Sequence, residues 1–301
     1  MARSKLTPMR WFVILLLIVC ILSLVLASDP RIFNTFHISR GAHRLIVLFL
    51  LLPLAALWYA SFFAYAKLQE YTRYLKSSKE GKAFRKITSG LGTLAFGLII
   101  IYIISLVLYY AAAHKSGLQA TAIIINNYLS LLVPVLAFTL INSGSHMLVE
   151  LVNERASLLG IRVFAIMFTI LGVFYTHITL QTHNLIINPY HLSVYPLMIT
   201  LVIPYLYAWF VGLVSAYNFK IYSEHVKGLL YKKSLSQFAA GITITIVGSI
   251  AVQFVISTVG AKTNEPLGLV LAVIYLLMAI LLGGLGLMAV STQKLKKIEE
   301  V

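Results

Sequence analysis

Long apolar runs with almost no charged residues recur along the whole chain, and they constrain its fold more than any other feature. Each run has about 18–28 residues, which at about 1.5 Å of helical rise per residue can cross a hydrocarbon core about 30 Å thick. Because a chain in lipid must satisfy its backbone hydrogen bonds internally, we predict an all-α, polytopic integral membrane protein. We expect eight transmembrane helices, near residues 11–28, 44–67, 89–112, 122–149, 158–178, 195–219, 236–260 and 267–291.

The composition excludes an ordinary soluble domain. Hydrophobic residues make up 60% of the chain and charged residues 11%, against about 45–50% and about 25% in soluble domains. The net charge of +15 is carried by short segments between apolar runs, which favours membrane topology over nucleic-acid binding. The single cysteine, Cys20, excludes an intramolecular disulfide and a cysteine-based metal site.

The first apolar run, at 11–28, has two interpretations. A basic start followed by an apolar run resembles a cleaved secretory signal, but this run is longer than the usual apolar region of about 7–15 residues. The run also has a counterpart in the fifth, where RVFAIMF stands in place of RWFVILL. We therefore expect a retained first helix.

The basic residues alternate in number from one inter-run segment to the next. With the N-terminus inside, inner segments hold 19 Lys and Arg and outer segments hold 5. Basic residues prefer the cytoplasmic side of a membrane. This bias predicts that both termini lie in the cytoplasm, in a multi-pass protein of the cell membrane.

Two stretches of the chain, residues 53–99 and 204–250, match without a gap at an offset of 151 residues, half the chain length. We interpret the match as an internal duplication, with residues 1–150 and 151–301 forming two four-helix repeats. Four spans in each half give both copies the same orientation, so the repeats are parallel. The matched pairs are Pro53 and Pro204, Trp58 and Trp209, Tyr71 and Tyr222, Lys76 and Lys227, Lys82 and Lys233, Gly90 and Gly241, Gly97 and Gly248, and Ile99 and Ile250.

The paired prolines, Pro53 and Pro204, fall inside predicted spans. Each removes a backbone hydrogen bond and can kink its helix. One interpretation is a hinge or broken helix beside a substrate path. The other, which we favour because proline is ordinary in membrane helices, is a packing kink inherited by both halves.

The paired glycines are Gly90 with Gly97 and Gly241 with Gly248. Seven residues are about two helical turns, so both members of a pair lie on one face of their helix. A face of small residues lets a second helix approach closely. We expect the third, seventh and eighth spans to lie at such helix contacts.

Polar residues gather in the fourth span, where Asn142, His146 and Glu150 share one face. An ionisable residue in a membrane span is a functional candidate by default. His146 and Glu150, one turn apart, are suited to relay a proton or bind a cation. The alternative is that both lie at the cytoplasmic interface, where such residues are ordinary.

The seventh span carries Thr245, Ser249 and Gln253 at intervals of four residues. This polar face either lines an aqueous path or supplies hydrogen bonds between helices. The matching residues of the third span include Leu94, Leu98 and Tyr102. Any path is therefore asymmetric, and we predict that the fourth and seventh spans build it.

Known catalytic and cofactor motifs are missing from the sequence. There is no Walker A loop, no dinucleotide-binding glycine motif, no HExxH and no nucleophile elbow. Six histidines on the predicted outer side could gather a transition metal, but their spacing matches no metal motif, and we favour a scattered set at the membrane interface. We therefore expect no metal, no cofactor and no enzymatic activity.

The inner segments between spans two and three and between spans six and seven are basic and rich in tyrosine. They suit contact with anionic lipid headgroups, as short amphipathic helices on the inner leaflet. The resulting hypothesis for function is a small-solute or ion transporter or permeation protein built from a tandem repeat. The alternative is a non-catalytic membrane subunit that acts in assembly or sensing with a partner protein or as a homo-oligomer.

Overall fold

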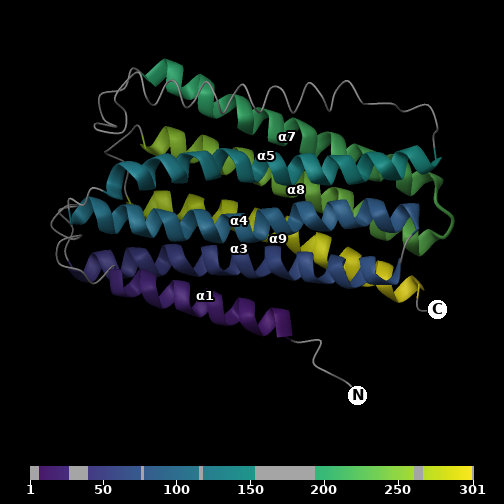
Figure 1. Ribbon diagram of the computed structural model, residues 1–301, viewed down its shortest axis with the longest axis horizontal. Coiled ribbons are helices and arrows are strands. Elements are labelled where there is room, and N and C mark those ends of the chain that lie inside the picture. Colours follow the sequence, from purple (N-terminus) through teal and green to yellow (C-terminus); the bar gives the residue numbers. More distant parts are fainter. Residues whose placement is uncertain are drawn as a thin grey trace. The chain divides into compact units, whose positions relative to one another are not determined.

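The computed structural model of the protein is helical throughout the part of the chain that it describes (Figure 1). That part comprises residues 7–26, 40–75, 78–114, 118–152, 194–260 and 267–299. Its helices are α1 (Thr7–Leu26), α3 (Arg40–Tyr74), α4 (Lys79–Ala113), α5 (Leu118–Val152), α7 (Val194–His225), α8 (Leu229–Gly260) and α9 (Leu267–Glu299). The all-α prediction is confirmed for these residues. The predicted fifth span, 158–178, lies outside them, so the count of eight stays a prediction.

Five helices of the described residues are long and apolar enough to cross a membrane, whereas the apolar part of α1, Arg10–Leu26, is shorter. The five candidate spans are Leu51–Tyr74, Lys79–Leu108, Leu132–Val152, Leu229–Ala251 and Tyr275–Leu295. Several such helices in one chain are what a multi-pass membrane protein requires.

Large apolar side chains point away from the protein on several helices, most clearly on α1. Phe12 and Val19 of α1 are buried, whereas Trp11, Leu17 and Val25 are exposed. Contiguous exposed apolar surface of this kind is unfavourable in water and favourable against lipid. Ser23 binds α1 to α4, because its hydroxyl lies 3.0 Å from that of Tyr102.

The basic segments are continuous with the membrane helices, and this corrects the expectation of separate helices lying on the leaflet. Helix α3 continues to Tyr74 and α4 begins at Lys79; likewise α7 continues to His225 and α8 begins at Leu229. The turn between α7 and α8 contains Gly228 with a φ of 101°, a conformation that glycine adopts readily. Basic side chains on extended helices need no separate amphipathic element, because the helices already place them beyond the apolar run.

The contacts of the chain divide it into two compact units, and the division cuts across helices. The first contains α1, α3 to Ala55, α4 from Leu94, α5 to Leu136 and α7 to Tyr207. The second contains the remaining parts of these four long helices together with α8 and α9. This division is not the division of the sequence into residues 1–150 and 151–301, which stays a prediction.

A chain of aromatic rings forms the core of the second unit. Tyr71 of α3 meets Phe84 of α4 edge-on, with centroids 5.1 Å apart, and Phe84 lies 6.4 Å from Phe219 of α7. Phe219 in turn meets Phe238 of α8 at 4.9 Å. All four side chains are fully or almost fully buried. Edge-to-face contacts add to the stabilisation that burial of large rings provides, so these four rings hold α3, α4, α7 and α8 together.

The two prolines of the predicted repeat lie within the bounds of α3 and α7. Pro53 is buried within α3, which continues through it without interruption, so α3 is not a broken helix. The side chain of Pro204, within the bounds of α7, lies outside the described residues.

The paired glycines lie where α4 faces α5 and where α8 faces α9. A Cβ atom on Gly90 would stand 2.5 Å from the backbone oxygen of Ala137, and Gly97 faces Val133. A Cβ atom on Gly241 would stand 2.7 Å from the oxygen of Gly284, and one on Gly248 would stand 3.0 Å from Leu281. At each position the missing side chain makes room for the neighbouring helix.

Candidate functional site

A buried polar seam joins α5 to α7 within the second unit. It consists of Asn142, Ser145 and His146 on α5 and of Ser215 and Asn218 on α7, and we call these five residues the α5–α7 seam. All except the half-buried Asn142 are buried. Most other buried polar side chains of the described residues are serines and threonines, which can satisfy themselves on their own helix. Asparagine and histidine have two polar side-chain atoms and need partners elsewhere.

Hydrogen bonds connect the two sides of the seam. The Asn218 amide donates to Ser145 Oγ at 3.2 Å, and that hydroxyl donates to the backbone oxygen of Asn142 at 2.9 Å. The Asn142 amide donates across to Ser215 Oγ at 3.3 Å and to the backbone oxygen of Val211 at 3.4 Å. Burial of these groups would be costly without such partners, so the seam specifies how α5 and α7 align.

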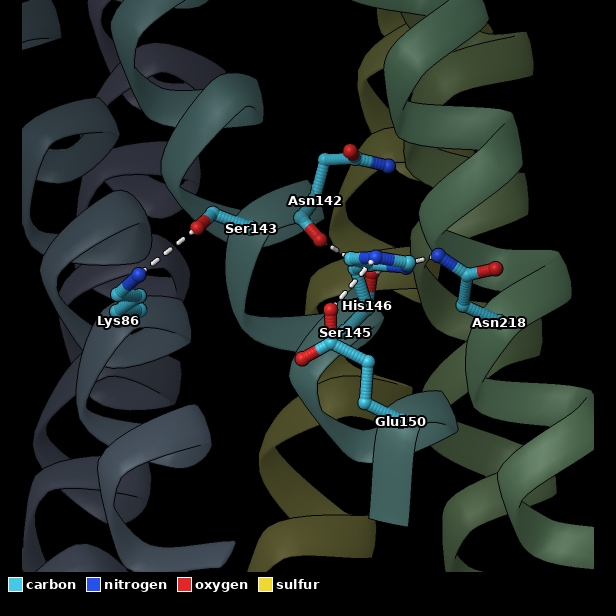
Figure 2. Close-up of polar contacts among 7 residues, drawn as sticks. All are labelled: Lys86, Asn142, Ser143, Ser145, His146, Glu150 and Asn218. Carbon is cyan, nitrogen blue, oxygen red and sulfur yellow. Dashed lines mark hydrogen bonds and ion pairs between the residues drawn. The ribbon is translucent and has the colours of Figure 1, made fainter. Parts of the chain in front are cut away.

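His146 and Glu150 link the seam to its surroundings (Figure 2). His146 Nε2 lies 2.9 Å from Glu150 Oε1, although the imidazole side chain is only 2% exposed and the carboxylate is 48% exposed. Imidazole changes its charge near neutral pH and can both donate and accept a proton. The pair therefore connects a group inside the protein with one that is accessible from outside it.

The opposite side of α5 faces α4 through a different contact. Figure 2 shows Ser143 pointing toward Lys86, away from Asn218. Lys86 Nζ donates to Ser143 Oγ at 3.0 Å, and this pair is exposed. Ser143 is thus a polar residue of the same helix turn that takes no part in the seam.

The polar residues predicted on the seventh span form other bonds. Thr245 Oγ1 donates to the backbone oxygen of Gly241 at 2.8 Å, and Ser249 Oγ donates to that of Ile246 at 2.8 Å. Thr245 also faces Gly284 of α9. The side chain of Gln253 lies outside the described residues. The cross-helix bonds of Asn142 go to α7. A path shared by the fourth and seventh spans stays a prediction.

The α7 members of the seam, Ser215 and Asn218, were not among the residues that the sequence singled out. They are three residues apart and therefore share a face. The sequence feature that could have identified them is the asparagine near the end of the sixth predicted span, 195–219. It was weak, because a polar residue near the end of a span is common.

A second polar cluster joins α3, α4 and α8. The Tyr231 hydroxyl donates a hydrogen bond to the carboxylate of Glu80 and lies 3.0 Å from the hydroxyl of Tyr71. Because Tyr71 is fully buried, these bonds satisfy a phenol inside the protein. Within the described residues, no group of three or more His, Cys, Asp and Glu side chains is arranged to hold a metal ion.

Comparison of the chain with protein-family models, with curated proteins and with solved structures finds no match.

Proposed function

We propose that the protein transports a small solute or ion across the cell membrane, with proton movement through the α5–α7 seam, and that it is not an enzyme. The observation that carries the proposal is the bond between the buried imidazole of His146 and the exposed carboxylate of Glu150. An ionisable side chain inside a membrane protein is energetically costly and usually marks an ion or substrate pathway.

The proposed role of each group follows from its chemistry. Glu150 exchanges protons with the aqueous side, and His146 passes a proton between Glu150 and the interior. Asn142, Ser145 and Asn218 supply hydrogen-bonding groups that can rearrange around a polar solute. Because these groups are bonded to one another across two helices, a small separation of α5 and α7 would free them together.

A tandem repeat of residues 1–150 and 151–301 is part of the proposal, and three contacts support it. Lys86 binds Ser143, and Lys294 Nζ donates to Gln237 at 3.1 Å. Gln237 and Lys294 stand 151 residues after Lys86 and Ser143, so one contact recurs with donor and acceptor exchanged.

The third contact joins Glu80 to Tyr231, which are themselves 151 residues apart. Two positions related by a two-fold axis can touch only near that axis. A parallel repeat with its axis along the membrane normal, and with both termini in the cytoplasm, accommodates this contact.

Ion flux into vesicles tests the proposal. Purified protein is placed in liposomes that contain a pH-sensitive dye, and flux is followed after an acid step, with potassium and valinomycin to clamp the potential. We expect flux above that of protein-free vesicles. The variant His146→Ala should reduce it to near that background, and Ser143→Ala, on the opposite side of α5, should leave it unchanged.

Two results would contradict the proposal. The first is the absence of proton flux above that of protein-free vesicles. The second is equal flux for the wild type and His146→Ala, since the seam would then carry nothing.

The alternative function is that of a non-catalytic membrane subunit, and the turn between α7 and α8 favours it. Leu229 and Leu230 are 82% and 68% exposed, next to the exposed Lys227, Lys232 and Lys233. This turn lies on the predicted cytoplasmic side, where it suits anionic headgroups or a partner protein. The subunit function predicts that a stoichiometric partner co-purifies with the wild type in mild detergent and is lost from the double variant Leu229→Ser/Leu230→Ser. It also predicts no flux in the liposome assay.

A further inference from the structure

A groove of about 480 Å³ runs between α7 and α8 on the side of the second unit. Ala216 and Ala239 are buried lining residues, and the groove opens beside Tyr217, which is 62% exposed. The volume lies in the range of about 300–1,000 Å³ that is usual for ligand pockets. The small alanine side chains are what leave this space open.

The groove changes from polar to apolar along its length. Helices α7 and α8 are joined by the short turn at 226–228, so they are antiparallel neighbours. Lys220 and Ser236 therefore lie toward the turn, and Leu213 and Ile244 lie toward the middle of the membrane. An occupant that fits this gradient has an anionic end near the cytoplasmic side and an apolar end in the hydrocarbon.

The equivalent space between α3 and α4 is filled by the protein itself. Tyr65, 151 residues before Ala216, packs on Gly92, where a Cβ atom would stand 2.9 Å from the tyrosine ring. Gln69 donates to the Tyr65 hydroxyl at 3.2 Å, and the ring lies 5.7 Å from that of Phe62. The second half has Ala216, Thr243 and Lys220 in place of Tyr65, Gly92 and Gln69. It thus lacks the ring and gains a positive charge.

We propose that the α7–α8 groove binds one anionic phospholipid of the inner leaflet, with its phosphate at Lys220 and an acyl chain along Ala216 and Ala239. A phospholipid has both ends that the gradient requires, and the inner leaflet supplies it at high local concentration. Lysine and tyrosine side chains at the headgroup level are suited to hold it. Lipid binding here requires no transport activity, so either result can hold without the other.

Native mass spectrometry of the full chain in mild detergent tests the site. The probes are phosphatidylglycerol and phosphatidylcholine with identical acyl chains. We expect the wild type to retain one molecule of phosphatidylglycerol and, under the same conditions, no phosphatidylcholine. The double variant Ala216→Tyr/Thr243→Gly reproduces the Tyr65–Gly92 pair and should lose this lipid, whereas Ala279→Tyr, at an exposed position of α9, should keep it.

The variant Lys220→Gln reproduces Gln69 and tests the charge alone. One lysine near a membrane surface contributes about 1 kcal/mol, so the preference for phosphatidylglycerol over phosphatidylcholine should fall about fivefold while lipid is still bound. Because Lys220 is exposed, this variant decides the question even where the double variant fails to fold.

Three results would overturn the lipid site. One is unchanged retention of phosphatidylglycerol by a folded Ala216→Tyr/Thr243→Gly variant. Another is an unchanged lipid preference in Lys220→Gln. The third is a wild-type dimer that the double variant converts to a monomer without loss of lipid, since a second copy of the chain would then be the occupant.

Discussion

Helices α8 and α9 meet through glycines, whereas α5 and α7 meet through hydrogen-bonded side chains. Between α8 and α9, Gly241 and Gly284 face each other with no room for a methyl group. Between α5 and α7, Asn218 reaches across to Ser145. The first contact depends on close packing, and its glycines have no side-chain functional group. The second depends on hydrogen bonds between side chains of two helices, and it is the contact through which we propose that protons move.

The largest effect on stability is expected from a substitution that breaks the glycine contact between α8 and α9. A Cβ atom in Gly241→Ala would stand 2.7 Å from the backbone oxygen of Gly284, which cannot move without shifting α9. Overpacking of this kind costs about 1–3 kcal/mol, so the melting temperature in mild detergent should fall clearly.

The neighbouring position Gly283 provides the matched control for Gly241→Ala. Nothing lies within 4 Å of a Cβ atom built there, and alanine favours a helix over glycine by up to about 1 kcal/mol. Gly283→Ala should therefore leave the melting temperature unchanged or raise it. Equal destabilisation by both variants would mean that close packing at Gly241 is not what holds the contact.

A smaller effect is expected from the polar contact. Asn218→Ala removes the donor to Ser145, and hydrogen bonds between membrane helices contribute about 0.6 kcal/mol on average. The loss of thermal stability should therefore be well below that of Gly241→Ala. Ser223→Ala, which removes a buried hydroxyl bonded within α7, is the control. A loss from Asn218→Ala as large as that from Gly241→Ala would make the seam a structural contact.

The smallest effect is expected at the two exposed lysine contacts. Lys86→Ala removes the bond to Ser143, and Lys294→Ala removes the bond to Gln237. Exposed polar pairs contribute little, so each variant should change stability by less than about 1 kcal/mol, and by the same amount. Thermal denaturation of the two variants side by side measures this, and unequal losses would count against equivalent positions in the two halves.

The sequence was informative about the face of α5 and uninformative about its partner. The spacing of Asn142, His146 and Glu150 placed them on one face, because helical periodicity is a local property. The prediction that the seventh span, within α8, shares a path with the fourth rested on polarity alone, and it stays a prediction. In the structure the cross-helix bonds of Asn142 go to Ser215 and Val211 of α7, and no local signal distinguishes one polar helix from another.

The sequence by itself determined the helical class, the apolar runs and the close-packing faces of Gly90 and Gly241. Each of these follows from backbone hydrogen bonds within one segment, from hydropathy or from the size of one residue. Only the tertiary structure decided that α3 and α7 extend through their basic ends and that His146 is buried beside Glu150. It also decided that Ala216 lines a groove between α7 and α8 and that Tyr65 packs against Gly92. These features depend on which helices become neighbours, and that choice is made by side chains far apart in the sequence.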